Sequence, residues 1–180
     1  MSTSLSARAL FAFVISTGLV GTRTGPPASM SGTIAGVSQM KYTQQHALAL
    51  AGSSSPVLLL NEASGTNRST GALEYMSGAQ VTTREIANLV RGNGPHSGYL
   101  SLGKDADSTV SKWEGKVITT LGADHQPSTR FEGTWTLMSG TGKYVGVTGT
   151  GTYKGQMISP AEYSLEWNGT LQVEPRAASR

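Results

Sequence analysis

The sequence predicts an all-β protein, a single antiparallel barrel of about eight strands. Three observations lead to this prediction. Short apolar or alternating segments are separated by turns rich in Gly, Ser and Thr, which is typical of strands. Charged residues make up only 14% of the 180 residues, whereas there are 23 glycines, and this composition disfavours exposed helices. Finally, one aromatic–glycine pattern occurs four times in the C-terminal half. A chain of this length predicts one domain.

The repeated pattern is an aromatic residue, any residue, a glycine, any residue and an apolar residue. It occurs at Trp113–Val117, Phe131–Trp135, Tyr153–Met157 and Trp167–Leu171. Side chains of a strand alternate between its faces, so each copy predicts an amphipathic strand with its aromatic residue and glycine on the apolar face. Glycine lets a strand bend as a sheet closes into a barrel, and the neighbouring aromatic ring fills the space. The short spacing between copies fits an antiparallel meander.

The apolar faces of these strands are predicted to point inward. An eight-stranded barrel is either filled by its side chains or holds one small ligand. Aromatic side chains would make that interior suitable for a small apolar molecule such as a lipid, terpenoid or polyene. The predicted ligand-binding residues are Trp113, Phe131, Trp135, Tyr153 and Trp167.

The polar faces of the same strands carry charges of both signs. Glu114, Glu132 and Glu166 share these faces with Lys112, Lys116 and Arg130. Such a mixture favours cross-strand charge pairs on the outer surface. The alternative is an interior cluster of carboxylates, which could serve acid–base chemistry.

The remaining elements are read from the first half of the chain. The apolar run 57–62 predicts a strand buried on at least one face, and residues 72–76 form the next strand candidate. Residues 80–90 fit either a strand or a short helix. A loop is expected over 91–98, followed by a strand at 99–102.

The N-terminal segment 1–28 has one positive charge at Arg8 and an apolar run from Ala9 to Val20. That run is too short to cross a membrane as a helix and is typical of a signal peptide. We therefore expect export to the periplasm or secretion; the alternative is a disordered extension of a cytoplasmic protein. Residues 29–44 are interpreted as a linker, 45–173 as the barrel and 174–180 as a tail.

A glycine-rich segment between the second and third copies, "SGTGKYVGVTGTGTY" at 139–153, leads into a strand. Over about residues 45–173 the chain resembles the allene oxide cyclase and dirigent families, as a bacterial-type relative. The resemblance implies an eight-stranded antiparallel barrel, a cyclase-type or stereocontrolling activity, and a homo-oligomer, either trimer or dimer. The residues that match the shared glycine motif are Gly140, Thr141, Gly142, Lys143, Tyr144, Gly146 and Gly149.

The resemblance also bears on single residues. Plant allene oxide cyclases have a glutamate and, two positions later, an asparagine on their first strand. Here the asparagine position falls on Asn61, but Leu59 occupies the glutamate position and can act neither as an acid nor as a base. This difference favours ligand binding over turnover.

The candidate catalytic residues are Asn61, His96 and Tyr99. Asn61 also fits ordinary polar chemistry at a strand end, and His96 fits a loop histidine bonded to backbone or water. Tyr99 and Tyr75 could donate a phenol hydrogen bond to a ligand, or pack in the core with satisfied hydroxyls.

Several classes of function lack support in the sequence. The three histidines, His46, His96 and His125, are not spaced as metal ligands, and the chain has no cysteine. Asp105 and Asp107 lie in a turn that lacks the later carboxylate of a calcium loop. Net charge is +3 without a basic run, so no nucleic-acid partner is expected. No cofactor motif and no membrane span are predicted.

Two functions follow from these observations. The first is a small barrel that binds an apolar ligand without assured turnover. The alternative is a cyclase or isomerase that positions a reactive apolar substrate in the barrel, where orientation supplies most of the catalysis.

Overall fold

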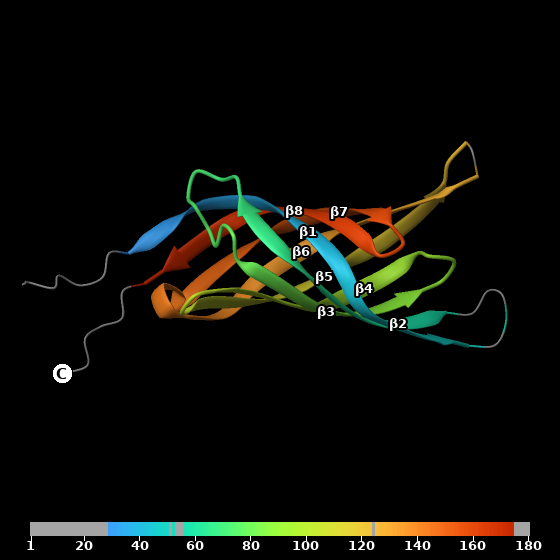
Figure 1. The fold of residues 1–180 in the computed structure, drawn as a ribbon, viewed down its shortest axis with the longest axis horizontal. Coiled ribbons are helices and arrows are strands. Elements are labelled where there is room, and N and C mark those ends of the chain that lie inside the picture. Colours follow the sequence, from blue (N-terminus) through green and yellow to red (C-terminus); the bar gives the residue numbers. More distant parts are fainter. Residues whose placement is uncertain (1–28, 51, 53–55, 124, 175–180) are drawn as a thin grey trace, which may run out of the picture.

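The computed structural model describes residues 29–50, 52, 56–123 and 125–174, and its eight antiparallel strands close into one barrel. This confirms the predicted fold class. Neighbours in the barrel are neighbours in the sequence, and β8 pairs with β1 (Figure 1). The expected signal peptide at 1–28 and residues 175–180 of the expected tail lie outside the described residues. The strands are β1 (Met30–Ala49), β2 (Val57–Ser69), β3 (Gln80–Leu89), β4 (Gly94–Lys104), β5 (Asp107–Leu121), β6 (Pro127–Thr141), β7 (Val147–Ser159) and β8 (Glu162–Val173).

The first strand, β1, occupies most of the segment interpreted as a linker over 29–44, so that interpretation is wrong, as is the barrel start at 45. Its buried, inward positions alternate with less buried ones from Ile34 through Gly36 and Ser38 to Met40. The strand is not apparent from the sequence because the inward residues Gly36 and Ser38 are small, and Ser38 is also polar. Gly36 lies under the ring of Trp167, and Ser38 donates a hydrogen bond to a buried asparagine.

The segments that follow also differ in part from expectation. In the segment 80–90, residues 80–89 form strand β3 rather than a helix, because Val81, Thr83 and Ala87 alternate inward with period two. The expected loop 91–98 is shorter, since β4 already begins at Gly94. A tight turn with positive φ at Arg91 (52°) and Gly92 (75°) joins the two strands, as is typical of two-residue hairpins.

The aromatic–glycine pattern is explained by pairing between strands. Each ring lies over a glycine directly opposite it on a neighbouring strand, not over the glycine of its own copy. Trp135 of β6 faces Gly151, Phe131 faces Gly155, and Trp113 of β5 faces Gly98. A Cβ added at any of these glycines would collide with the facing ring. The glycines therefore leave the space that the inward rings occupy.

A loop closes one end of the barrel. Residues 72–76, expected as a strand, instead belong to the β2–β3 connection. Buried Asn67 holds this loop: its side-chain Nδ2 donates to the carbonyls of Tyr75 (3.1 Å) and Met76 (3.0 Å). Its Oδ1 accepts hydrogen bonds from Ser38 (3.2 Å) and from the indole of Trp167 (3.1 Å). We call residues 70–79 the plug.

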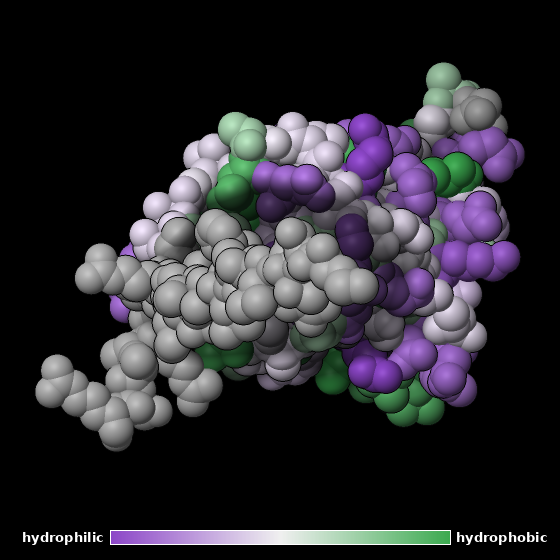
Figure 2. All heavy atoms as spheres, turned by 60° about the vertical axis from the view of Figure 1, so that its left-hand side comes forward, coloured by the Kyte–Doolittle hydropathy of each residue, from purple (hydrophilic) through white to green (hydrophobic). Residues whose placement is uncertain are grey.

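Figure 2 shows hydrophilic side chains gathered over part of the outer surface. Glu114 and Glu166 are exposed, and Glu132 is paired with Lys116 across strands at 3.1 Å, so the three carboxylates lie outside the barrel as expected. Among the described residues, no helix has the length and apolar character needed to cross a membrane.

Candidate functional site

The barrel encloses a cavity of about 260 Å³ that is open at one end. The plug and Tyr144, which is 1% exposed, cover the other end. The open end, which we call the mouth, is lined by Gln45, Leu59, Leu89, Thr129 and Met157, where β1, β3 and β7 end and β2 and β6 begin. Large apolar side chains are also exposed near the mouth, namely Leu48, Leu50, Leu58, Leu121 and Ile158.

The five residues predicted to bind a ligand all line this cavity: Trp113, Phe131, Trp135, Tyr153 and Trp167. Their inward placement follows from the alternation of β5 to β8. Their contact with a ligand stays a prediction. Further apolar and aromatic side chains complete the wall, among them Tyr42, Leu100, Leu102, Tyr163 and Leu165.

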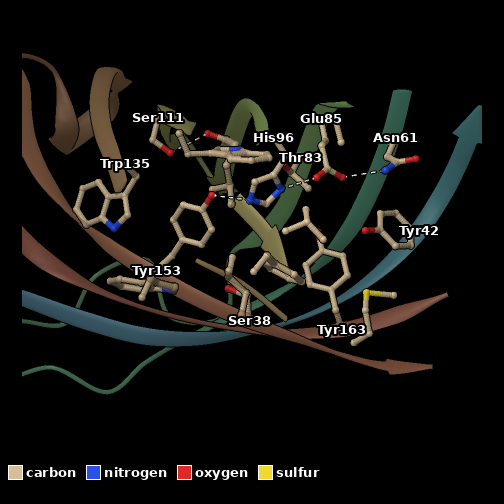
Figure 3. Close-up of a pocket in the computed structure, with 18 of the residues that line it drawn as sticks. Ser38, Tyr42, Asn61, Thr83, Glu85, His96, Ser111, Trp135, Tyr153 and Tyr163 are labelled. Carbon is tan, nitrogen blue, oxygen red and sulfur yellow. Dashed lines mark hydrogen bonds and ion pairs between the residues drawn. The ribbon is translucent and has the colours of Figure 1, made fainter. Parts of the chain in front are cut away.

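One connected set of polar side chains interrupts the apolar wall (Figure 3). Asn61 donates from Nδ2 to Oε2 of Glu85 at 2.9 Å. The other carboxylate oxygen, Oε1, lies 2.7 Å from Nδ1 of His96. The opposite ring nitrogen, Nε2, lies 3.0 Å from the hydroxyl of Tyr153. We call these four residues the polar chain.

The strand register brings the polar chain together. Asn61 of β2 stands directly opposite Glu85 of β3, and His96 of β4 stands opposite Ala87, two residues further along β3. Tyr153 comes from β7 and reaches His96 across the lumen side of β5 and β6. Its hydroxyl has room because positions 115 and 133 are glycines; a Cβ at Gly115 would lie 2.5 Å from that oxygen.

Burial and packing against two aromatic rings also fix the His96 side chain. Its side chain is 3% exposed, and its ring packs against Trp113 and Phe131 with centroids 4.8 and 5.7 Å away. Glu85 is slightly more open, with 12% of its side chain exposed. A buried carboxylate needs charged or hydrogen-bonding partners, which Asn61 and His96 supply.

The surroundings of three cavity tyrosines raise the pKa of their hydroxyls. Burial, and secondly the negative charge of Glu85, raises the pKa of the Tyr153 hydroxyl far above its usual value. Burial is likewise the main cause of the raised pKa of Tyr42 and Tyr163, and Glu85 contributes to both. All three phenols are therefore hydrogen-bond donors at neutral pH.

The three candidate catalytic residues from the sequence lie in different parts of the structure. Asn61 and His96 line the cavity, and His96 lies inside β4 rather than in a loop. Tyr99 is 54% exposed on the outer wall, so it cannot act in the cavity. Tyr75 is buried beside the plug, where its hydroxyl pairs with Thr109 at 2.7 Å.

Sequence reasoning missed Glu85. The segment 80–90 was ambiguous between helix and strand, so the direction of this side chain was not assigned. The signal lay in the period of two that runs from Val81 through Thr83 to Glu85 and Ala87, which puts a carboxylate on an otherwise inward face.

Within the described residues, no group of three His, Asp or Glu side chains is arranged to hold a metal ion. Asp107, considered above as part of a turn, accepts a hydrogen bond from the backbone N–H of Lys143 at 3.0 Å and pairs with its ammonium at 3.2 Å. The buried Oδ1 of Asn61 has no hydrogen-bond partner among the described residues. Within the polar chain, this side chain bonds to Glu85 through its Nδ2.

In comparisons with known proteins, no protein-family model and no curated protein matches the chain.

Proposed function

We propose that the barrel binds one small, mainly apolar molecule in its cavity. The observation that carries this proposal is the cavity itself, about 260 Å³ of space with a mainly aromatic and aliphatic wall, the polar chain and a few Ser, Thr and Gln side chains. Pockets for drug-sized ligands measure about 300–1,000 Å³ and combine an apolar lining with a few polar groups. A cavity slightly below that range favours a compact ligand. The apolar side chains exposed around the mouth favour access by such a molecule.

The first test is binding of N-phenyl-1-naphthylamine, an uncharged aromatic dye whose fluorescence rises in apolar surroundings. We expect saturable binding of one dye per chain. In parallel, native mass spectrometry of protein purified from its own host should detect an apolar molecule that copurifies. Absence of saturable dye binding and of any copurified molecule would overturn the proposal.

A matched pair of variants locates the binding. Ala87 is 2% exposed and lines the cavity, whereas its neighbour Asn88 is exposed on the outer wall. Ala87→Phe places a ring in the cavity, so we expect at least a tenfold weaker dye affinity. Asn88→Phe should bind as the unmodified protein does. Thermal unfolding of both variants verifies that they remain folded.

A second candidate is a cyclase or isomerase of the allene oxide cyclase type, and the polar chain favours it. The family resemblance implies a glutamate and an asparagine from one strand. In this chain Leu59 occupies the glutamate position, but Glu85 brings a carboxylate to Asn61 from the neighbouring strand, 2.9 Å away. Incubation of the protein with host lipid extracts should then yield a new product; no change in the extract would count against turnover.

A further inference from the structure

We propose that Tyr153, His96 and Glu85 form an acid–base site that moves a proton on an apolar carbonyl compound bound in the barrel. The proposal rests on the proposed function, because it requires that the cavity admit such a molecule. It adds the catalytic group, the route of the proton and the chemical class of the substrate.

The order of the hydrogen bonds defines the route. An ionised Glu85 can only accept, so Nδ1 of His96 carries the hydrogen in their 2.7 Å contact. In a neutral imidazole the other nitrogen, Nε2, is then an acceptor, and the Tyr153 hydroxyl donates to it over 3.0 Å. A hydroxyl bonded to a base that is itself oriented by a carboxylate is the arrangement that activates side chains in many enzymes.

The surroundings hold this arrangement in place. The rings of Trp113 and Phe131 pack edge-on against His96. Glycines at 115 and 133 admit the Tyr153 hydroxyl to the position where it meets Nε2. Asn61 holds the second oxygen of Glu85. A polar chain inside a mainly apolar cavity is costly to bury unless its hydrogen bonds are made. All three bonds between its members are made, at 2.7 to 3.0 Å.

The proton balance of one turnover is simple. A C–H bond next to the substrate carbonyl breaks, and its proton goes to the Tyr153 oxygen. The original Tyr153 hydroxyl proton goes to Nε2 of His96, which becomes an imidazolium beside Glu85. The electron pair of the C–H bond forms the enolate. Return of the proton to another carbon, or to the same one, restores the protein, and no oxidant or reductant is consumed.

The substrate class follows from this balance and from the wall. The molecule must be largely apolar, must fit in about 260 Å³ and must carry a carbonyl with an acidic neighbouring C–H. The enolate is stabilised by the imidazolium charge. Tyr42 and Tyr163 also line the cavity, and their hydroxyls stay protonated, so either can donate a hydrogen bond to the enolate oxygen.

The test uses phenylacetone, a compact apolar ketone with acidic benzylic protons, in deuterated buffer. Nuclear magnetic resonance follows the loss of these protons. We expect the protein to accelerate exchange at least tenfold over buffer, and Tyr153→Phe to remove at least nine-tenths of that acceleration. Ketone affinity, measured by tryptophan fluorescence, should change less than twofold. Tyr99→Phe, on the outer wall, should exchange as the unmodified protein does.

Two readouts separate this proposal from a purely structural role. Nitrogen NMR of the unmodified protein should show the neutral His96 ring protonated at Nδ1, and Glu85→Gln should alter that signal and slow exchange together. The opposite tautomer would overturn the proton route. Exchange no faster than in buffer overturns the inference whether or not the ketone binds, while the dye experiment decides the proposed function separately.

Discussion

At the scale of single residues, the buried polar side chains of His96 and Asn67 have different roles. His96 belongs to the cavity, whereas Asn67 belongs to the fold: it bonds two plug carbonyls, a serine of β1 and the indole of Trp167. Asn67 is 1% exposed. Each of its partners is buried or partly buried, so none of them can turn to water without a rearrangement of the plug.

Asn67→Leu therefore removes four hydrogen bonds and leaves their partners unpaired in the interior. Since an unsatisfied buried polar group costs about 1–3 kcal/mol, we expect unfolding free energy to fall by at least about 2–3 kcal/mol. Urea denaturation at neutral pH measures the change. Asn88→Leu on the outer wall serves as the control and should shift the curve little. Equal curves for the two variants would contradict the role assigned to Asn67.

Buried phenols predict how stability depends on alkaline pH. Burial raises the pKa of Tyr75 and Tyr163 in the folded protein well above the value of about 10 for a free tyrosine. Unfolded chains therefore lose these protons first, so the stabilisation is complete below about pH 10 and is lost as the pH rises further. We expect the thermal midpoint to fall steadily above pH 10. Ultraviolet absorbance should show tyrosinate appearing together with unfolding; ionisation of all six tyrosines in a folded barrel would refute this.

At the scale of strands, the pairing of a ring with a glycine on the next strand shapes the barrel wall. The relation holds between β4 and β5, between β6 and β7 and between β8 and β1. Each glycine is inward, and each ring covers it from the neighbouring strand. The glycines leave room for these rings on the inner side of the wall, where the rings line the cavity.

Two glycine variants test this relation. A Cβ at Gly155 would collide with the Phe131 ring, while a Cβ at Gly103 would have no heavy atom within 4 Å. Gly155→Ala should cost about 1–3 kcal/mol, as is typical of overpacking. Gly103→Ala, also in a strand, should be neutral or slightly stabilising because alanine restricts the unfolded chain. Chemical denaturation of both proteins measures the contrast, and a cost of the same size at both sites would argue against ring–glycine packing.

The strands also show what sequence could predict. The four aromatic–glycine copies predict barrel strands because strict alternation is visible in each. β1 was missed since its inward residues include Gly36 and Ser38, whose small side chains hide the period. The register that joins Asn61 to Glu85 depends on the hairpin geometry of β2 and β3, which residue types alone do not specify. His96 was a candidate, but its partner Tyr153 lies 57 residues away in the chain.

At the scale of the whole molecule, the two ends of the barrel differ. β1 begins and β8 ends at the closed end, beside the plug (Figure 1). At the opposite end β1, β3, β5 and β7 end and β2, β4, β6 and β8 begin around the mouth, where the cavity opens. The polar chain crosses the lumen from Asn61 of β2 to Tyr153 of β7, and its His96 ring packs against Trp113.

This asymmetry predicts that ligands enter through the mouth. Leu59 lines the cavity at the mouth, whereas the next residue, Leu60, is 54% exposed on the outer wall. Leu59→Trp narrows the opening, so we expect association of N-phenyl-1-naphthylamine to slow at least tenfold in stopped-flow fluorescence. Leu60→Trp adds the same ring outside and should associate within twofold of the unmodified rate. Unchanged association in Leu59→Trp would contradict entry through the mouth.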